Sequence, residues 1–438
     1  MIRLVPAILC ALLTGAHILR FQGPVAAAGF VLLPGLLLLR ERWVLPAARG
    51  LLAVGALAWV LVTVRLVQAR VAMGGPWPRL LLILSAVTVL HLVAALLLRG
   101  NRLESRYAGH PQRAGTQAGA FLGALGLLVV VRSKAGAAMF LAERFVPGAS
   151  WITIFALAVW AAFLAGRLQD ERRIADVRVR AWSLFSAVFF LQLLLGLAGI
   201  ERCLMTGTLH LPVPAMIAAG PVYRGGGFFM PVLFLATIVV AGPAWCSHLC
   251  YIGAWDNLLA RRRRQAQIPG QDGPARPRID PRWYTLVATV GVAFALRVAG
   301  VGSLPATTLG ATFGLVGIGI MLFASRRRGV MAHCTEWCPI GLLAVRLGKL
   351  SPFRLAIREG CRNCGLCLPT CRYGALTEED LRHGRPGPNC TLCGDCLASC
   401  RKDQVVYKFL GLSPAGARKA FVAVVAALHA VFLGVARI

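Results

Sequence analysis

Charged residues are scarce in this chain. They make up 15% of its 438 residues, whereas a soluble globular protein carries about 25%. That scarcity excludes an ordinary soluble protein. Acidic residues are the scarcest, with 17 Asp and Glu against 47 Lys and Arg. The net charge of +30 does not indicate a nucleic-acid partner, because the arginines lie in short loops between apolar segments, as they do where they orient membrane helices.

The chain also lacks a convincing signal-peptide cleavage site. Its first residues, MIRLVPAILCALLTG, combine a basic residue with an apolar run. A small-residue cleavage site followed by a polar mature domain does not come after them. We therefore expect this stretch to form the first membrane helix.

Long apolar segments recur instead, such as LLLILSAVTVLHLVAALLL at 80–98. Segments of this length span a bilayer core, and backbone groups in lipid must be paired internally, so they are expected to be helices. The sequence predicts an all-α polytopic membrane protein with about eleven transmembrane helices, at 4–19, 22–39, 50–64, 80–98, 118–131, 150–166, 183–200, 227–244, 284–299, 307–324 and 419–436.

Basic residues predict how these helices are oriented. Nineteen of them, including Arg40, Arg42 and Arg261–Arg264, lie in one set of alternate loops, and nine lie in the opposing set. The richer set is expected to face the cytoplasm. The amino terminus is then inside and the carboxyl terminus outside, which suits a multi-pass protein of a bacterial inner membrane.

One polar segment interrupts the apolar pattern, at 345–410. It is too short to bury a large core, so it needs a metal or disulfide staple, and its cytoplasmic side favours metal. We expect four domains: a six-helix membrane region at 1–180, a membrane core at 181–344, this cytoplasmic insert, and a last transmembrane helix at 411–438.

Two matched cysteine runs occupy the insert, CRNCGLCLPTC at 361–371 and CTLCGDCLASC at 390–400. Each has the spacing C-x2-C-x2-C-x3-C, in which three cysteines hold one iron–sulfur cluster and the fourth reaches the other. The runs thus predict two [4Fe–4S] clusters in a small α+β ferredoxin-like domain. Structural zinc is the alternative, but it more often uses separated CxxC pairs. The predicted ligands are Cys361, Cys364, Cys367 and Cys400 for the first cluster, and Cys390, Cys393, Cys396 and Cys371 for the second.

Two shorter motifs stand at the ends of apolar segments, WCSHLCYIG at 245–253 and HCTEWCPIG at 333–341. They align without a gap, so the helix pairs 183–244 and 284–324 look like two copies of one unit. The C-x3-C spacing is expected to place both thiols on one helical face. The four cysteines are either a third cluster or metal site, or packed or reversibly oxidised thiols: Cys246, Cys250, Cys334 and Cys338.

These motifs, followed by the two cysteine runs, resemble the NapH/NosR/CcoG group of membrane polyferredoxins over about 181–410. Tyr251 replaces the proline of the first C-x3-C-P motif, and Arg372 and Arg401 replace the proline that usually follows a ferredoxin run. The first six helices are additional to the NapH plan. The resemblance implies an electron-transfer subunit of a quinol dehydrogenase, with a quinone pool and a partner redox protein or further subunits as partners.

Three polar residues near the C-x3-C motifs could serve a quinone as proton acceptors, His248, His333 and Glu336. They could equally be ordinary interfacial residues. His17 and His91 are expected at different membrane depths and would not share a haem. Tryptophans at 245, 255, 283 and 337 suit the aromatic belt of a membrane protein.

The sequence thus favours a membrane-bound iron–sulfur protein that passes electrons between the quinone pool and a partner redox protein. A maturation or regulatory factor, which supplies electrons for metal-centre assembly in another respiratory enzyme, is the alternative. A scaffold whose cysteines hold zinc is a third reading. The scarcity of ionisable residues inside the first six spans argues against an ion pump.

Overall fold

A computed structural model describes six stretches of the chain, residues 4–22, 24–37, 44–107, 111–203, 211–262 and 279–435. Some arginines used to orient the helices, at 40, 42, 263, 264, 276 and 278, lie outside these residues. The chain is mostly helical and divides into two compact units, 1–121 and 122–438. This division falls inside helix α6, whereas the domain boundary expected at 180/181 falls inside helix α9.

The first unit is built from apolar helices with largely exposed surfaces. Its helices are α1 Val5–Gln22, α2 Pro24–Leu36, α3 Val44–Ala72, α4 Pro78–Leu97, α5 Asn101–Tyr107 and the start of α6 Pro111–Ala135. Leu57 and Leu82 are among many large apolar side chains that α3 and α4 expose. Exposed apolar surface of this extent marks contact with a partner or a membrane.

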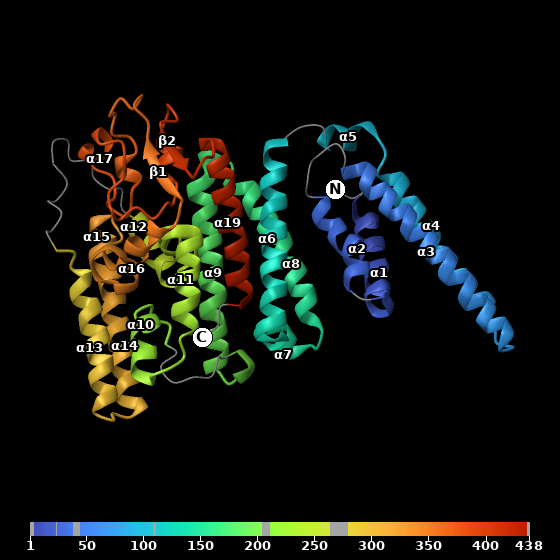
Figure 1. The fold of residues 1–438 in the computed structure, drawn as a ribbon, viewed down its shortest axis with the longest axis horizontal. Helices are drawn as coiled ribbons and strands as arrows, with labels where there is room; N and C mark the ends of the chain where they lie inside the picture. The colour runs from blue at the N-terminus through green and yellow to red at the C-terminus, as the bar shows by residue number, and fades with distance from the viewer. Residues whose placement is uncertain are drawn as a thin grey trace. The chain divides into compact units, whose positions relative to one another are not determined.

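The second unit holds the remaining helices and the polar insert (Figure 1). Proline occupies the first position of several helices in the chain, where its missing N–H costs nothing. The helices of this unit after α6 are α7 Leu141–Phe145, α8 Ala149–Leu168, α9 Ile174–Leu197, α10 Met216–Arg224, α11 Phe229–Ala241, α12 Tyr251–Arg261, α13 Arg282–Val298, α14 Ser303–Ile320, α15 Arg326–Arg328, α16 Pro339–Leu347, α17 Glu378–Arg382, α18 Asp395–Ser399 and α19 Pro414–Val435.

Eight helices in the described part of the chain are long and apolar enough to cross a membrane, by length and composition. The predicted spans at 4–19, 22–39 and 284–299 coincide with α1, α2 and α13, which are not among these eight helices. The model thus supports a membrane protein, and the count of eleven spans stays a prediction.

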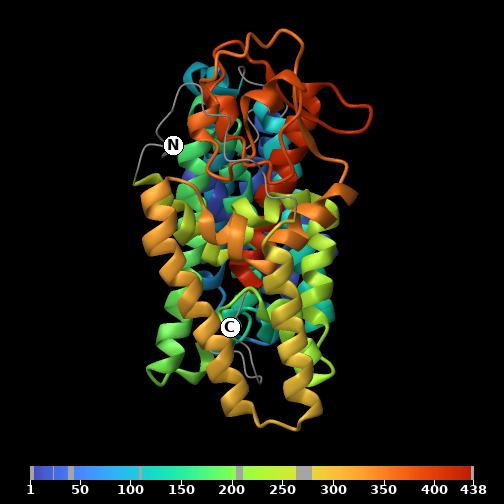
Figure 2. The same ribbon diagram turned by 90° about the vertical axis from the view of Figure 1, so that its left-hand side faces the viewer.

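The insert contains the sheet of the described chain, two antiparallel strands, β1 Arg354–Ile357 and β2 Val405–Lys408. Arg354 pairs with Lys408 and Ile357 with Val405, so the sheet closes the segment that carries both cysteine runs. The insert lies above α12 and α16 in Figure 1, and the turn joining α13 to α14 lies at the opposite end of the unit (Figures 1 and 2).

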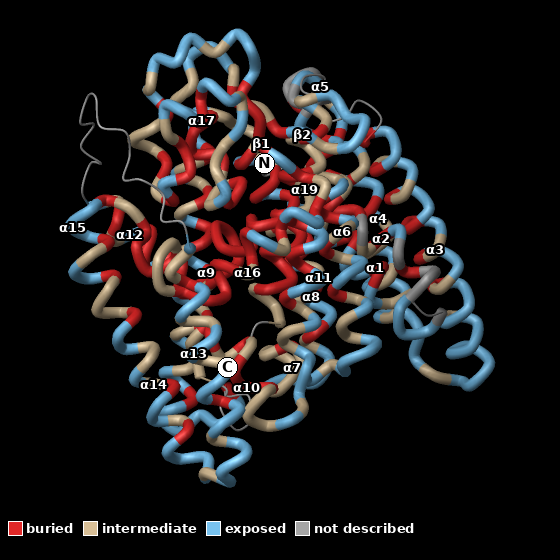
Figure 3. The backbone as a smooth tube through the Cα atoms, turned by 60° about the vertical axis from the view of Figure 1, so that its left-hand side comes forward, coloured by how far each residue is buried: buried red, intermediate tan, exposed pale blue. Residues whose placement is uncertain are grey.

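The buried core of the second unit runs from the membrane helices into the insert. It includes Trp182, Phe185 and Ile238 in the helices, and Leu355 and Tyr407 in the sheet. Figure 3 shows the buried backbone gathered around α9, α11 and α16, while α13 and α14 are largely exposed. The insert is therefore packed onto the helices and shares one core with them.

Candidate metal centres

The two cysteine runs of the insert have matching backbones. At three equivalent positions φ is positive, a conformation rare for residues other than glycine. Leu392, with φ of 56°, is an unusual occupant of it because its side chain is large. Such residues curl the chain so that successive N–H groups point into one concavity, as in many Fe–S sites. The matched pairs are Asn363 and Leu392, Gly365 and Gly394, and Gly374 and Asp403.

Backbone N–H groups also donate to sulfur in the same way in both runs. Ala375 donates to Cys371 Sγ at 3.2 Å, and Gln404 donates to Cys400 Sγ at 3.2 Å. In each case the donor lies four residues after the last cysteine of its run. Hydrogen bonds to sulfur favour the thiolate form, which is the form that binds metal.

Cysteines of the two runs lie together in an interleaved arrangement. Burial and, to a smaller extent, the neighbouring thiols of Cys400, Cys361 and Cys364 raise the pKa of Cys367 to about 11. Cys400 belongs to the second run and the other three to the first. These are the four residues that spacing assigns to the first cluster.

The second set of cysteines surrounds a small cavity. Cys371, Cys390, Cys393 and Cys396 all line it. Burial raises the pKa of Cys390 to about 12, and it raises that of Cys393 and Cys396. Clustered, buried thiols of this kind are protonated at neutral pH until a metal displaces their protons.

The C-x3-C motifs differ from the single helical face that their spacing suggests. Each begins as a π-helical turn, Trp245–Leu249 or His333–Trp337, and its second cysteine has an extended backbone. The N–H of Cys250 donates to Trp245 O at 3.0 Å, and that of Cys338 donates to His333 O at 2.8 Å. Pro339 disfavours the helical conformation for Cys338, and Cys250 adopts the same conformation before Tyr251.

The four C-x3-C thiols are buried in the core of the second unit and lie near one another. Burial raises the pKa of Cys250 to about 12, with a further contribution from Cys338. Burial also raises the pKa of Cys334, and Asp256, Cys338 and the thiols of the first motif add to the shift. The two motifs therefore lie together in one core.

Glycines allow each motif to close on itself in the same way. A Cβ atom at Gly253 would lie 2.9 Å from Cys246 O, and one at Gly341 would lie 2.7 Å from Cys334 O. Asp256 then joins the two copies, because its Oδ2 accepts the N–H of Cys334 at 3.0 Å.

The donor sets are compatible with iron–sulfur clusters. Zinc bound by thiolates holds each sulfur at about 2.3 Å, so its ligands must converge on one point. Within the described residues, no three His, Cys, Asp or Glu side chains are placed to hold one metal ion. An iron–sulfur cluster is larger and keeps its ligands further apart, which is compatible with three groups of neighbouring but unconverged thiols.

Buried polar contacts attach the insert to the membrane helices. Arg178 of α9 is fully buried and binds Asp395 of the second run through two nitrogens, at 3.1 and 2.8 Å. Its third nitrogen donates to Ser247 O at 2.9 Å, inside the first C-x3-C motif. Ser247 Oγ in turn donates to Thr391 O at 2.9 Å. Sequence reasoning counted Arg178 as one of the loop arginines, because its partner Asp395 is 217 residues away.

The three residues proposed to lie near a quinone occupy different surroundings. Glu336 forms a half-exposed ion pair with Arg328, at 2.8 and 2.5 Å. His248 is buried against Phe421 of α19, and its Nδ1 lies 2.9 Å from Ser247 Oγ. His333 is also buried, yet neither ring nitrogen has a hydrogen-bond partner of ordinary geometry. Burial lowers its pKa to about 4, which the nearby Gly317 backbone opposes.

Trp337, which the sequence assigned to the aromatic belt, is half-buried within the second C-x3-C motif. It is stacked on Phe313 of α14, with centroids 5.0 Å apart, and lines an apolar cavity inside the second unit. Trp245, also expected in an aromatic belt, is buried against Phe234. The position of Trp337 immediately before Cys338 was the sequence feature that could have placed it beside the C-x3-C cysteines.

Residues 17 and 91 do not share a ligand site in the first unit. His91 is fully buried, with one ring nitrogen 2.6 Å from Thr14 Oγ1 and the other 2.8 Å from Val87 O. His17 packs against Trp59, with ring centroids 4.8 Å apart and an angle of 41° between the ring planes. Both nitrogens of His91 are therefore already occupied by protein groups.

Comparison with known protein families gives one match. Residues 224–269 match the model of a 4Fe-4S binding domain. The matched segment contains α11 and the first C-x3-C motif, so the family model covers this motif rather than the insert. The match supports an iron–sulfur protein of ferredoxin type with at least one cluster. Neither the curated proteins nor the solved structures provide a match.

Proposed function

We propose that this chain is a membrane-bound electron-transfer protein that connects the quinone pool with a partner redox protein. The 4Fe-4S binding domain and the eight apolar helices support the iron–sulfur and membrane parts of this proposal. The quinone and the partner follow the resemblance to NapH-type polyferredoxins. Interconversion of a quinol and a quinone moves two electrons and two protons, so the partner must accept or supply two electrons for each quinone.

The position of Tyr373 carries this proposal. Its hydroxyl donates to Cys246 O at 3.1 Å, and its side chain lines the cavity that the second set of insert cysteines surrounds. It therefore lies between the C-x3-C cysteines and the second set of insert cysteines. Cysteine groups that adjoin one another in this way suit an electron relay. Separate structural sites would not need to be adjacent.

Three cysteine groups are assigned on this basis. A [4Fe–4S] cluster bound by such thiolates carries one electron at a time at a potential that the surrounding protein tunes. Cys364 is exposed and Cys361 is half-buried, so the first insert set is the one open to a partner. The groups, from membrane edge to surface, are Cys246, Cys250, Cys334 and Cys338; Cys371, Cys390, Cys393 and Cys396; and Cys361, Cys364, Cys367 and Cys400.

The proposed orientation follows the loop arginines. The insert would face the cytoplasm of a bacterial cell, with the amino terminus inside and the carboxyl terminus outside. The partner would then be a cytoplasmic protein or a subunit exposed on that side.

Iron analysis and electron paramagnetic resonance test the assignment. Protein purified without oxygen is compared with Cys246→Ser, Cys367→Ser and Cys396→Ser, one from each group. Each variant is expected to lose the iron and the resonance signal of one cluster. Cys203→Ser is the matched control, because Cys203 is buried but lies in none of the three groups.

Two results would contradict parts of the proposal. Full iron content in Cys246→Ser would refute the cluster proposed at the C-x3-C cysteines, while the two insert clusters would still stand. Zinc in place of iron, in protein made and purified without oxygen, would remove electron transfer altogether.

A further inference from the structure

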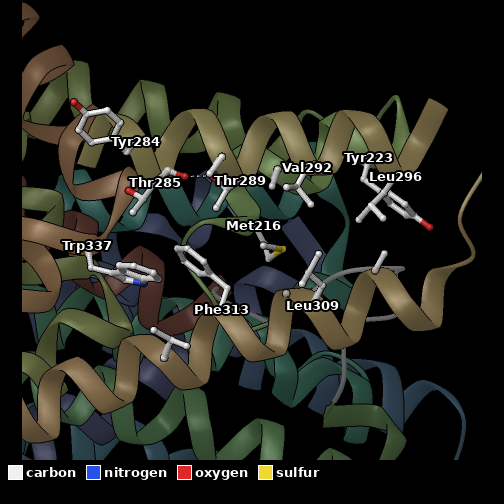
Figure 4. Close-up of a pocket in the computed structure, with 16 residues that line it drawn as sticks. Met216, Tyr223, Tyr284, Thr285, Thr289, Val292, Leu296, Leu309, Phe313 and Trp337 are labelled. Carbon is white, nitrogen blue, oxygen red and sulfur yellow. Dashed lines mark hydrogen bonds between the residues drawn. The ribbon is translucent and has the colours of Figure 1, made fainter. Parts of the chain in front are cut away.

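The second unit contains an apolar cavity that the cysteine groups do not use. It has a volume of about 470 Å³ and lies between α10, α13 and α14 (Figure 4). This is within the range of small-molecule sites, about 300 to 1,000 Å³. Met216, Ala219, Val292, Leu296 and Leu309 are among the side chains that make its wall apolar.

The cavity opens toward the surface that would contact lipid. Val292, Leu309 and Val316 line it and are themselves exposed. α14 belongs to one of the segments long and apolar enough to cross a membrane. A molecule dissolved in the bilayer could therefore enter between α13 and α14 without passing through water.

One end of the cavity carries an unused hydrogen-bond donor. Trp337 Nε1 is buried and has no hydrogen-bond partner among the described residues, and a buried donor without a partner is unfavourable. Three other hydroxyl groups in the wall donate to backbone carbonyls: Tyr223 to Val301 O, Thr285 to Arg282 O and Thr289 to Thr285 O. The indole N–H thus needs an acceptor that a ligand would bring.

Aromatic rings surround this end. Figure 4 shows Trp337 and Phe313 beside Thr285 at one end of the cavity, and Leu296 and Tyr223 at the other. The rings of Trp337 and Phe313 are stacked with an angle of 24° between their planes. This end suits a flat ring with an acceptor oxygen, and the long apolar remainder suits a hydrocarbon tail.

We propose that this cavity binds a membrane quinone, with a ring carbonyl accepting the Trp337 N–H and the isoprenoid tail lying between α13 and α14. The inference rests on the function proposed above and gives it a location. Trp337 directly precedes Cys338, so the bound ring would lie beside the C-x3-C cysteines. A phospholipid chain could fill the same apolar space, but the hydrocarbon itself carries no acceptor for the Trp337 N–H.

Binding of decylubiquinone to the full-length protein in detergent tests the proposal, measured by titration calorimetry. Trp337→Phe keeps an aromatic ring and removes the donor, and it should weaken binding about tenfold. Ala288→Phe adds a ring to the cavity wall and should abolish binding. Trp283→Phe and Ala295→Phe are the matched controls on α13, because neither residue lines the cavity, and they should bind as wild type does.

The outcomes separate this inference from the proposed function. Iron content is measured in every sample, so a variant that fails to fold is recognised. Equal binding by wild type, Trp337→Phe and Ala288→Phe would overturn this site and leave a quinone function elsewhere in the chain. Binding that Ala288→Phe abolishes but Trp337→Phe leaves unchanged would identify a site for hydrocarbon chains, which also overturns the proposal. Absence of binding in the iron-loaded wild type would contradict both the site and the quinone function, while the iron–sulfur assignment would stand.

Discussion

The buried ion pair between Arg178 and Asp395 should hold the insert on the membrane helices. Asp395→Asn removes the charge that both Arg178 and Arg261 bind, at 2.8 Å each. Arg178 would keep its bond to Ser247 O and a neutral acceptor in the amide oxygen, while its fully buried charge would be left without a countercharge. Removing one partner of a buried pair costs about 3–5 kcal/mol, because the remaining charge is left uncompensated.

Arg178→Met should cost less than Asp395→Asn. Asp395 would then still be bound by Arg261, which is partly exposed and can be solvated. The free energy of unfolding would fall by about 1–3 kcal/mol, which is the cost of buried groups that lose a hydrogen bond. Replacing both partners together, with Arg178→Met and Asp395→Leu, should recover much of the loss, because well-packed apolar residues often substitute for a buried pair.

Thermal unfolding in detergent measures these differences, and hydrogen exchange in the insert localises them. The matched control is Glu378→Gln in the same insert, which breaks the exposed pair between Glu378 and Arg382, 3.7 Å apart. Exposed pairs contribute about 0–1 kcal/mol. The reasoning is refuted if Asp395→Asn is no more destabilising than Glu378→Gln, or if exchange in the insert is unchanged.

Two further substitutions test the local geometry of the sites. Gly253→Ala should cost about 1–3 kcal/mol and lower the iron content, because its Cβ would lie 2.6 Å from the Trp182 ring; Gly291→Ala, in the open on α13, should instead be neutral or stabilise by up to about 1 kcal/mol. Equal melting temperatures for these two variants would contradict the close packing. Asn363→Ala should cost about 1–2 kcal/mol, because alanine is disfavoured at a positive φ, while Asn363→Gly should not destabilise. Chemical denaturation distinguishes them, and an equal loss for both would show that the Asn363 side chain, not its backbone, matters.

Local patterns in the sequence were sufficient for much of the architecture. Apolar length predicted the positions of the helices, although α1, α2 and α13 are not among the eight that qualify as candidate membrane spans. The C-x3-C spacing was a poorer guide, because it assumed an α-helix where π-helical turns and extended cysteines occur. The spacing of the cysteines does not reveal the backbone conformation of the motif. That conformation depends on the residue after the second cysteine and on the close contact at Gly253.

The candidate site was predictable only in part, for a similar reason. Cysteine runs are recognisable because ligand spacing is a local property. The roles suggested here for Arg178, Tyr373 and Trp337 were not recognisable, because each depends on a partner that the sequence does not place nearby. Glu336 was a reasonable candidate by position, but its carboxylate is paired with Arg328 at the surface.

By itself, the sequence determined that this chain is apolar, helical and equipped with repeated cysteine motifs, since hydropathy and spacing are properties of short segments. Only the tertiary structure decided which segments meet. Packing brings the two C-x3-C motifs into one core and leaves a cavity beside Trp337. It also joins the insert to α9 through the ion pair of Arg178 and Asp395, which are 217 residues apart in the chain. These features depend on burial and contact between distant residues, which no local pattern specifies.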